Sequence, residues 1–531
     1  MGNIHRAREI ISALKELGVY EFVVCAGARN SPLAVVLSAS SEKLWFHFEE
    51  RSAAFFALGR ARNVHQPVAI VTTSGTAAAE LLPATIEAYY SGVPLVLVTA
   101  DRPKRFRGTG APQTIDQTHL FSSYVQAKVD VDVQEVFELP PWDGSAPMQV
   151  NVCFDEPLID VDSIPLLCKE GQGEVDLPHP TLPLQRGGGT CPRAMNSFQM
   201  NIAVSSFLNQ SQTPLVILGM LESEDRVPVC QFLQKLNAPI YAEAQSGLRE
   251  SPELADLILR SGEMILERGS FDAVLRIGGV PTTRFWRDLE TKYAPLPVVS
   301  ISTLPFSGLA RESQYFQLST YDDLNDIHAN VSPRRELRAL DRERHQKLLH
   351  LFERYPSSEP ALVYHLSRQI PKGSHVYVGN SLPIREWDLA ATYESKAFDV
   401  TASRGANGID GQLSTFLGLC RSDRENWGIF GDLTTLYDLA GPWVLQHMEA
   451  MNIRIVVINN GGGKIFDRMF EEKKLLNEHR LSFEPWARMW GLQYERWNTI
   501  PERISEHRHA IFELIPDSPQ TRGFWDAYEV L

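Results

Sequence analysis

The chain alternates short apolar runs with stretches of helical length, and this rhythm strongly limits its fold. Between residues 21 and 100 the apolar runs are EFVVC, LWFHF, VAIVTT and PLVLVTA, each followed by a segment long enough for one helix. Strands separated by single helices are typical of parallel sheets with crossover connections. We therefore predict a parallel α/β sheet in the first part of the chain.

The same alternation of apolar runs and helical segments occurs twice more along the chain. PLVILG, PIYAEA, FDAVLRIGG and PVVSIS form a second set of apolar runs, whereas HVYVGN, FDVTAS, NWGIFGD and IRIVVINN form a third set beyond a charged helix predicted over residues 332–354. At 531 residues the chain is also too long for a single core. We predict an α/β protein of three domains, each a mostly parallel sheet with helices on both faces.

A Gly- and Pro-rich segment without apolar periodicity, GQGEVDLPHPTLPLQRGGGTCP, separates the first two sets. Such a composition favours an interdomain linker, which we place at residues 171–192. The first domain would then span residues 1–170, the middle domain 193–335 and the third domain 336–531.

Composition narrows the classes of partner. The net charge is −14, whereas a nucleic-acid-binding surface needs a basic stripe. No window approaches the roughly 18 consecutive apolar residues of a membrane-spanning helix, and the N-terminal residues lack a signal-peptide apolar region. The six cysteines form no CxxC pair and are too sparse for a disulfide framework. We expect a cytoplasmic protein without a nucleic-acid partner and without a membrane span.

Two neighbouring strands of the third set end in residues suited to a hard cation. Gly431 and Asp432 end one strand, and Asn459 and Asn460 end the next. Because adjacent parallel strands end at the same edge of a sheet, we expect these side chains to lie close together. Magnesium takes about six oxygen ligands, and the glycines at 461–463 permit close approach of a diphosphate. Turns and helix caps use the same residue types, so a purely structural role remains open.

Glu49 and Glu50 open a predicted helix directly after the run LWFHF. Acidic residues in the first helical turn commonly interact only with the helix dipole. The local sequence therefore leaves their role open.

The Gly-Asp and Asn-Asn pairs resemble the cofactor signature of thiamine-diphosphate-dependent enzymes. Seven ordered segments carry a narrower resemblance: CAGARNSPL, FHFEERSAAFFALGRAR, VTTSGTAAAELLPATIEA, TADRPKRFRGTGAPQTIDQ, VGNSLPIREWD, SRGANGIDGQLST and GDLTTLYDL. Within that class these segments resemble the 2-succinyl-5-enolpyruvyl-6-hydroxy-3-cyclohexene-1-carboxylate synthase family of the menaquinone pathway. They span the first and third domains, whereas the middle domain is less recognisable.

The resemblance implies a transferase that decarboxylates 2-oxoglutarate on thiamine diphosphate and adds the succinyl-semialdehyde carbanion to isochorismate. It implies a pyrimidine-binding first domain and a diphosphate- and metal-binding third domain, with Mg²⁺ or alternatively Mn²⁺ as the metal. By the same resemblance Asp432, Asn460 and the carbonyl of Gly462 would hold that metal. The resemblance also implies an active site shared between domains of two chains, so we expect a homodimer or homotetramer with the active site at the subunit interface.

The resemblance also assigns the remaining site residues by position. Glu50 matches the glutamate that contacts the aminopyrimidine ring of the cofactor and exchanges a proton with it. Further cofactor contacts carry over to Ile409, Gly431, Leu433, Ile465 and Phe466. Arginine binds carboxylates bidentately, which suits substrates that each carry two of them. The substrate contacts carry over to Arg29, Arg102, Gln113, Arg284, Ser381, Arg385 and Arg404.

The chain departs from the family pattern at four positions and leaves three alternatives. Ala28 replaces a serine, Pro112 an asparagine, Arg284 a lysine and Leu433 a glycine. Another thiamine-dependent decarboxylase acting on monoacids would not need this many arginines. A flavin-dependent acetolactate-type synthase would be yellow, and a non-catalytic thiamine-fold module would be expected to lack Glu50 or Asp432.

Overall fold

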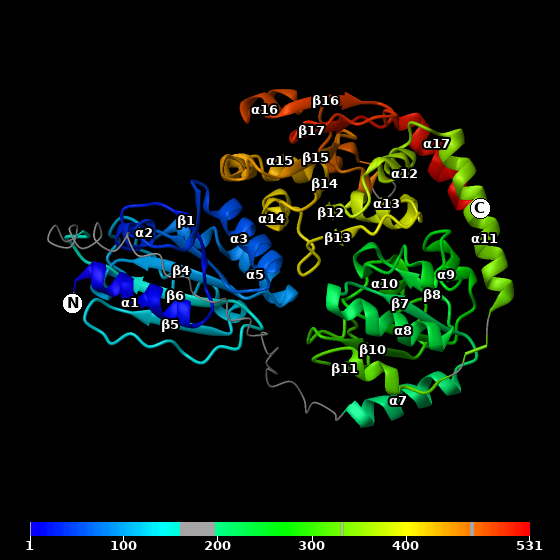
Figure 1. Ribbon diagram of the computed structural model, residues 1–531, viewed down its shortest axis with the longest axis horizontal. Coiled ribbons are helices and arrows are strands. Elements are labelled where there is room, and N and C mark those ends of the chain that lie inside the picture. The colour runs from blue at the N-terminus through cyan, green and yellow to red at the C-terminus, as the bar shows by residue number, and fades with distance from the viewer. Residues whose placement is uncertain (1, 160–196, 330, 333, 468–471) are drawn as a thin grey trace. The chain divides into compact units, whose positions relative to one another are not determined.

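The computed structural model describes residues 2–159, 197–329, 331–332, 334–467 and 472–531 (Figure 1). The predicted linker at 171–192 lies outside these residues. The chain divides into two compact units, each described separately below. The first comprises Met1–Gly189, Ser403–Arg421 and Thr434–Ala450, and the second comprises Thr190–Ala402, Ser422–Leu433 and Met451–Leu531. The prediction of three parallel α/β sheets is confirmed.

The first unit contains a six-stranded sheet with the order β2-β1-β3-β4-β6-β5. Every pairing in it is parallel. The first four strands are those predicted from the sequence, whereas β5 and β6 were not anticipated. The strands are β1 (Glu21–Cys25), β2 (Lys43–His47), β3 (Val68–Thr72), β4 (Leu95–Asp101), β5 (Ala127–Val131) and β6 (Met148–Cys153). The helices before β5 are α1 (Asn3–Glu16), α2 (Ser31–Ser38), α3 (Glu50–Val64), α4 (Thr76–Ala79) and α5 (Leu82–Ser91), with 3₁₀ turns η1 (Lys104–Phe106) and η2 (Ser122–Tyr124).

The second unit contains a five-stranded parallel sheet with the order β11-β10-β9-β7-β8, which includes the four strands predicted for the middle domain. Its strands are β7 (Pro214–Leu218), β8 (Ile240–Ala242), β9 (Ala273–Ile277), β10 (Val298–Ser302) and β11 (Gln314–Gln317). Its helices are α7 (Ser197–Gln210), α8 (Arg226–Leu236), α9 (Met264–Arg268) and α10 (Arg284–Asp288), with η4 (Ser223–Asp225), η5 (Ala244–Ser246), η6 (Pro252–Leu254) and η7 (Asp322–Asp326).

The second unit also contains a six-stranded parallel sheet with the order β13-β12-β14-β15-β17-β16. Its strands are β12 (His375–Val378), β13 (Asp399–Thr401), β14 (Glu425–Gly431), β15 (Asn452–Ile458), β16 (Gln493–Trp497) and β17 (His509–Leu514). The accompanying helices are α11 (Arg335–Arg354), α12 (Glu359–Gln369), α13 (Leu382–Ala390), α14 (Gln412–Leu419), α15 (Asp432–Tyr437), α16 (Glu484–Met489) and α17 (Ser518–Glu529), with η8 (Gly441–His447), η9 (Lys464–Phe466) and η10 (Lys473–Leu476). Helix α11 begins at Arg335, three residues later than predicted. Helix α14, η8 and the part of α15 from Thr434 onward belong to the first unit.

The two six-stranded sheets have the same topology. When the strands of each sheet are numbered in chain order, both run 2-1-3-4-6-5. In such sheets ligands bind beyond the carboxyl ends of the strands, where the winding reverses. That point lies between β1 and β3 in one sheet and between β12 and β14 in the other. Arg29 and Gly75 follow the first pair of strands, and Ser381 and Asp432 follow the second.

Helices α3 and α14 of the first unit pack at very close range (Figure 1). A Cβ atom added to Gly59 would lie 2.2 Å from the carbonyl oxygen of Thr415 and 3.0 Å from the Cα of Gly418. Asn63 donates from Nδ2 to the carbonyl oxygens of Leu419 at 3.1 Å and of Cys420 at 3.0 Å, where α14 ends. Glycine at 59 therefore allows the two backbones to meet.

We expect Gly59→Ala to lower the free energy of unfolding by about 2 kcal/mol, because the added methyl group forces the two helices apart. Helix propensity alone predicts the opposite sign, a gain of up to about 1 kcal/mol. Urea denaturation of the variant and the wild type shows whether the variant is less stable, as the close contact predicts, or more stable, as helix propensity predicts. A more stable variant would contradict the close contact between the helices.

Among the described residues, no helix combines the length and the apolar character that crossing a bilayer requires.

Candidate cofactor and substrate site

Asp432 lies directly beyond β14, where the sequence predicts a cation ligand. Gly431 pairs with Ile458 of β15, so the residues that follow these strands meet at one edge of the sheet. The carboxylate of Asp432 is 2% exposed and accepts backbone N–H groups from Leu433 at 2.6 Å, Gly461 at 2.8 Å and Gly462 at 2.9 Å. Burial raises its pKa although these hydrogen bonds favour the ionised form.

The two adjacent asparagines are held in different ways. Nδ2 of Asn459 donates to Glu513 at 2.6 Å and to the carbonyl oxygen of Leu481 at 2.8 Å. Nδ2 of Asn460 lies 3.1 Å from each carboxylate oxygen of Glu359. The Oδ1 atom of Asn460 is buried and accepts no hydrogen bond from the described residues. A buried amide oxygen without a donor is suited to a cation, which favours Asn460 over Asn459 as a ligand.

The donor set beside Asp432 fits a magnesium diphosphate. Gly462 has a φ of 138°, and its carbonyl oxygen accepts the N–H of Lys464 at 2.8 Å, which leaves a second lone pair. Within the described ranges, no group of three or more His, Cys, Asp or Glu side chains could hold a metal. A cation here would rely on one carboxylate, one amide oxygen and one carbonyl. Phosphate and water would supply the rest, as magnesium prefers.

Apolar side chains flank the glycine run. A Cβ atom added to Gly463 would lie 3.6 Å from Phe466 and 3.8 Å from Leu433. Phe466 is 40% exposed, which is unusual for so large an apolar side chain, and Ile465 beside it is half-buried. These residues form an apolar border to the polar edge of the sheet.

Glu49 and Glu50 have different roles in the structure. Glu49 is the N-cap of α3, and its carboxylate accepts the N–H groups of Arg51 at 3.1 Å and Ser52 at 3.0 Å. The carboxylate of Glu50 accepts no hydrogen bond from any other residue in the described part of the chain. Burial, together with the negative charges of Glu49 and Glu80, raises the pKa of Glu50. The capping role thus falls to Glu49, and Glu50 remains available for proton transfer.

Arg29 and Arg102 lie close together beyond the ends of β1 and β4. The buried guanidinium of Arg29 donates to the carbonyl oxygen of Phe154 at 2.9 Å and pairs with Glu156 at 3.2 Å. Burial, followed by the neighbouring charge of Arg102, lowers the pKa of Arg29. Two cations at such a sheet edge suit an anionic ligand.

Two predicted polar contacts have backbone conformations that are rare outside glycine. Gln113 has a φ of 54° and Ser381 a φ of 75°. Arg102 donates from Nε to the carbonyl oxygen of Pro112 at 2.9 Å, next to Gln113. Ser381 precedes α13, and its hydroxyl makes no capping hydrogen bond. Strained residues of this kind cluster at functional sites.

Two predicted arginines of the second unit, Arg284 and Arg385, act on the carboxyl group of Glu263, although the guanidinium of Arg284 itself pairs with Asp288 at 3.7 Å. The carboxylate of Glu263 accepts the backbone N–H of Arg284 at 2.8 Å. Burial raises the pKa of Glu263, whereas the charges of Arg385, Arg287 and Arg284 lower it. Arg287 was not predicted as a site residue, although it lies three residues after Arg284 in the same short helix, where the two side chains are neighbours. The guanidinium of Arg385 also donates to the carbonyl oxygen of Ser381 at 2.7 Å.

The loop that carries Arg404 and Ile409 belongs to the first unit. Glu87 of α5 accepts the N–H groups of Gly405 at 2.8 Å and Ala406 at 2.6 Å, and burial raises its pKa. The loop is therefore fixed to α5. Both Arg404 and Ile409 are half-buried.

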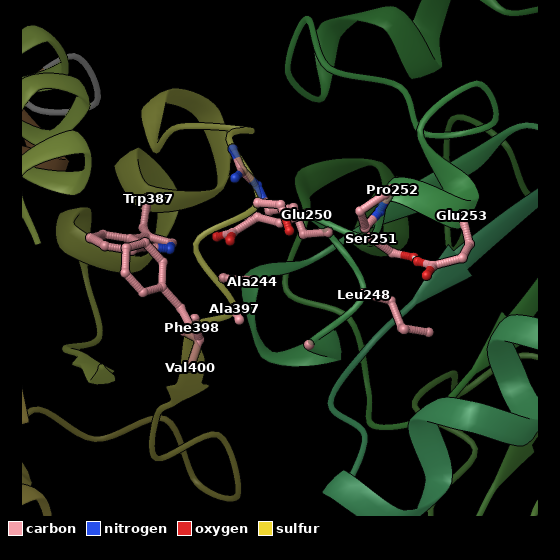
Figure 2. A pocket seen from close by; sticks show the side chains of 13 residues that line it. Ala244, Leu248, Glu250, Ser251, Pro252, Glu253, Trp387, Ala397, Phe398 and Val400 are labelled. Atoms are coloured by element: carbon pink, nitrogen blue, oxygen red, sulfur yellow. The ribbon is translucent and has the colours of Figure 1, made fainter. Parts of the chain in front are cut away.

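A cavity of about 230 Å³ lies elsewhere in the second unit (Figure 2). Trp387 and Phe398 line one side, and the segment from Leu248 to Glu253 lines the other. In this segment Arg249 donates to the carbonyl oxygens of Ala391 at 2.8 Å and Thr392 at 3.0 Å, just after α13. The segment thereby anchors the helix that begins next to Ser381.

We expect Glu250 in this cavity to make stability depend on pH. Burial raises its pKa from 4.5 to about 7, although Arg249 and Lys396 lower it. Because the folded protein favours protonated Glu250, this residue contributes stability that is fully present below about pH 4.5 and is lost as the pH rises through about 7. Glu250→Gln should therefore reduce the loss of stability between pH 5 and 8 by roughly 1–3 kcal/mol. Urea denaturation of the variant and the wild type between pH 5 and 8 tests this prediction. The control is Glu253→Gln at a nearby, fully exposed residue, which should leave the pH dependence of stability in this range unchanged.

The family described as "Thiamine pyrophosphate enzyme, N-terminal TPP binding domain" matches residues 5–120, which carry Arg29, Glu50, Arg102 and Gln113. Together with the matching six-stranded sheets and the polar sheet edge, this match defines a thiamine-diphosphate-dependent enzyme.

Comparison with curated relatives identifies the family to which the chain belongs within this class of enzymes. The chain is 44% identical to the 2-succinyl-5-enolpyruvyl-6-hydroxy-3-cyclohexene-1-carboxylate synthase of Bdellovibrio bacteriovorus, across 100% of this chain and 99% of that protein. It is 38% identical to the synthase of Akkermansia muciniphila, across 95% of this chain and 94% of the relative. It is 32% identical to that of Lysinibacillus sphaericus, across 93% and 90% respectively. The chain belongs to the 2-succinyl-5-enolpyruvyl-6-hydroxy-3-cyclohexene-1-carboxylate synthase family.

Proposed function

We propose that this enzyme decarboxylates 2-oxoglutarate and joins the remaining four-carbon unit to isochorismate in menaquinone biosynthesis. The main supporting observation is the presence of several arginines beyond strand ends. Arg102 acts on Arg29 in the first unit, and Arg385, Arg287 and Arg284 act on Glu263 in the second. Both substrates carry two carboxylates, which arginine binds bidentately. The product of this reaction is the compound after which the related synthases are named.

The residues at the sheet edge would hold the cofactor. Thiamine diphosphate, when bound, supplies a nucleophilic carbon and an electron sink for decarboxylation and carbon–carbon bond formation. Asp432, Oδ1 of Asn460 and the carbonyl oxygen of Gly462 would hold Mg²⁺, or alternatively Mn²⁺. Glu50 would hold and transfer a proton at its carboxyl group, a role that its raised pKa supports. The remaining cofactor contacts in this proposal are Ile409, Gly431, Leu433, Ile465 and Phe466.

Apolar side chains would exclude water from the site, and cationic and polar side chains would bind the substrates. Leu433, Ile465 and Phe466 would exclude water, which protects a reactive carbanion from protonation. The substrate carboxylates and polar groups would be held by Arg29, Arg102, Gln113, Arg284, Ser381, Arg385 and Arg404. The strained backbones of Gln113 and Ser381 support a direct contact for these two residues.

We also propose a cytoplasmic homodimer or homotetramer with an active site shared by two subunits, as the family resemblance implies. Free thiols at Cys25, Cys153, Cys230 and Cys420 support a reducing compartment. The proposed domains span residues 1–170, 193–335 and 336–531, and each range contains one of the three sheets.

A coupled assay tests the proposed function. Purified protein is mixed with thiamine diphosphate, Mg²⁺, 2-oxoglutarate and isochorismate, and the loss of isochorismate is followed together with carbon dioxide release. Equal consumption of both substrates is expected. Carbon dioxide release without loss of isochorismate would indicate a simple 2-oxo acid decarboxylase. No reaction despite bound cofactor would indicate another substrate or a non-catalytic module.

A further inference from the structure

Each asparagine of the Asn459-Asn460 pair is anchored by its own buried carboxylate. Glu513 of β17 anchors Asn459, and Glu359 of α12 anchors Asn460. The two carboxylates are 1% and 3% exposed respectively. Buried carboxylates are costly and are retained where they accept hydrogen bonds. Glu513 and Glu359 can therefore be compared as anchors of two neighbouring asparagines.

Glu359 is itself held firmly in place. It is the first residue of α12, after the N-cap Ser358, and its backbone N–H donates to Oγ1 of Thr521 on α17 at 3.1 Å. The buried carboxyl group of Glu386 on α13 lies next to it. The backbone of Glu359 is therefore tied to α17, and its carboxyl group has Asn460 and Glu386 as neighbours.

The contact determines which way the Asn460 carboxamide faces. Nδ2 is 3.1 Å from both Oε1 and Oε2 of Glu359, so the amide nitrogen is directed at the carboxylate. The opposite rotation would place Oδ1 against two carboxylate oxygens, where acceptors repel one another. Oδ1 must therefore face away from Glu359. It is the buried atom that accepts no hydrogen bond from the described residues.

We propose that Glu359 is a positioning residue, which holds the Asn460 carboxamide so that its oxygen faces the metal and diphosphate. This inference rests on the proposed function, in which Asn460 binds the metal. Groups that orient metal ligands in this way typically contribute about 10- to 100-fold to metal affinity. Glu513 is the matched residue without this role, because it anchors Asn459.

Three variants of Glu359 separate positioning from simple packing. Glu359→Met removes the acceptor and should weaken Mn²⁺ binding in the presence of thiamine diphosphate by about 10- to 100-fold. Glu359→Gln keeps an acceptor oxygen for Nδ2 and should restore affinity to within about 3-fold of the wild type, less than the effect of losing an orienting group. Should the methionine variant fail to fold, Glu359→Asp makes the same test, because its shorter side chain moves the oxygens away from Asn460.

Electron paramagnetic resonance of free Mn²⁺ during titration gives the affinity without any turnover. Glu513→Gln and Glu513→Met serve as controls. They alter the contacts of Glu513 with Asn459, Ser482, Phe483 and Tyr494 but none with Asn460, and should leave Mn²⁺ affinity unchanged. Equal losses in the Glu359 and Glu513 variants, or full affinity in Glu359→Met, would overturn the inference. A wild-type protein that binds no Mn²⁺ with the cofactor would overturn the proposed metal site itself, and the inference with it.

Discussion

Glu50→Gln is expected to lower kcat by roughly two to four orders of magnitude, while thiamine diphosphate still binds. Glutamine has nearly the same shape and polarity as glutamate but cannot take up or release a proton. Burial raises the pKa of Glu50, as expected for a carboxyl group that transfers protons near neutral pH. The coupled assay gives kcat, and calorimetric titration gives the cofactor affinity.

Glu49→Gln is the matched control for this prediction. Glu49 is the immediate neighbour, carries the same charge and caps α3 through its hydrogen bonds to Arg51 and Ser52. Its substitution should cost up to about 1 kcal/mol of stability and leave kcat within a few-fold of the wild type. Turnover that survives Glu50→Gln, or that falls equally in both variants, would contradict the role assigned to Glu50.

Much of the fold follows from the sequence because central parallel strands are buried on both faces. Strands such as β3 and β4 are continuous apolar runs, and their burial is complete. Strand β6 was missed, although it is central and fully buried, because Gln149 and Asn151 interrupt its apolar pattern. Their amide groups hydrogen-bond to Gln117 and Asp130 inside the protein, which a linear sequence does not reveal. Strand β16 was missed because it is a largely polar edge strand.

Some residues of the candidate site could likewise be predicted from the sequence, and others could not. Asp432 and Asn460 could be paired from the sequence because they follow neighbouring parallel strands. Glu359 and Glu513 could not, since they come from elements 101 residues from Asn460 and 54 residues from Asn459. Glu359 in the first turn of a helix has the same sequence signature as an acid that only favours the helix dipole. Only the folded structure shows which asparagine each carboxylate holds.

Asp432→Asn is expected to weaken magnesium-dependent binding of thiamine diphosphate by at least about 100-fold. The Asp432 carboxylate accepts one N–H with Oδ1 and two with Oδ2. Asparagine has one acceptor oxygen, so its amide nitrogen must face at least one of these donors. Loss of the charge and of these bonds corresponds to about two charge-assisted hydrogen bonds of roughly 1.5 kcal/mol each. Fluorescence titration with the cofactor, with Mg²⁺ and with EDTA, measures the effect.

Asp438→Asn separates metal binding from the structural cost of losing a buried carboxylate. Asp438 is fully buried and accepts hydrogen bonds from Oγ of Ser52 at 2.7 Å and from the backbone N–H of Ser414 at 2.7 Å. Both variants should lose about 1–3 kcal/mol of stability, because each leaves buried donors without an acceptor. Only Asp432→Asn should lose cofactor affinity, and its affinity in Mg²⁺ should match that of the wild type in EDTA. Cofactor binding that is unchanged in Asp432→Asn would show that the three N–H groups and the His479 ring, 3.2 Å from Oδ2, account for the buried carboxylate without a metal.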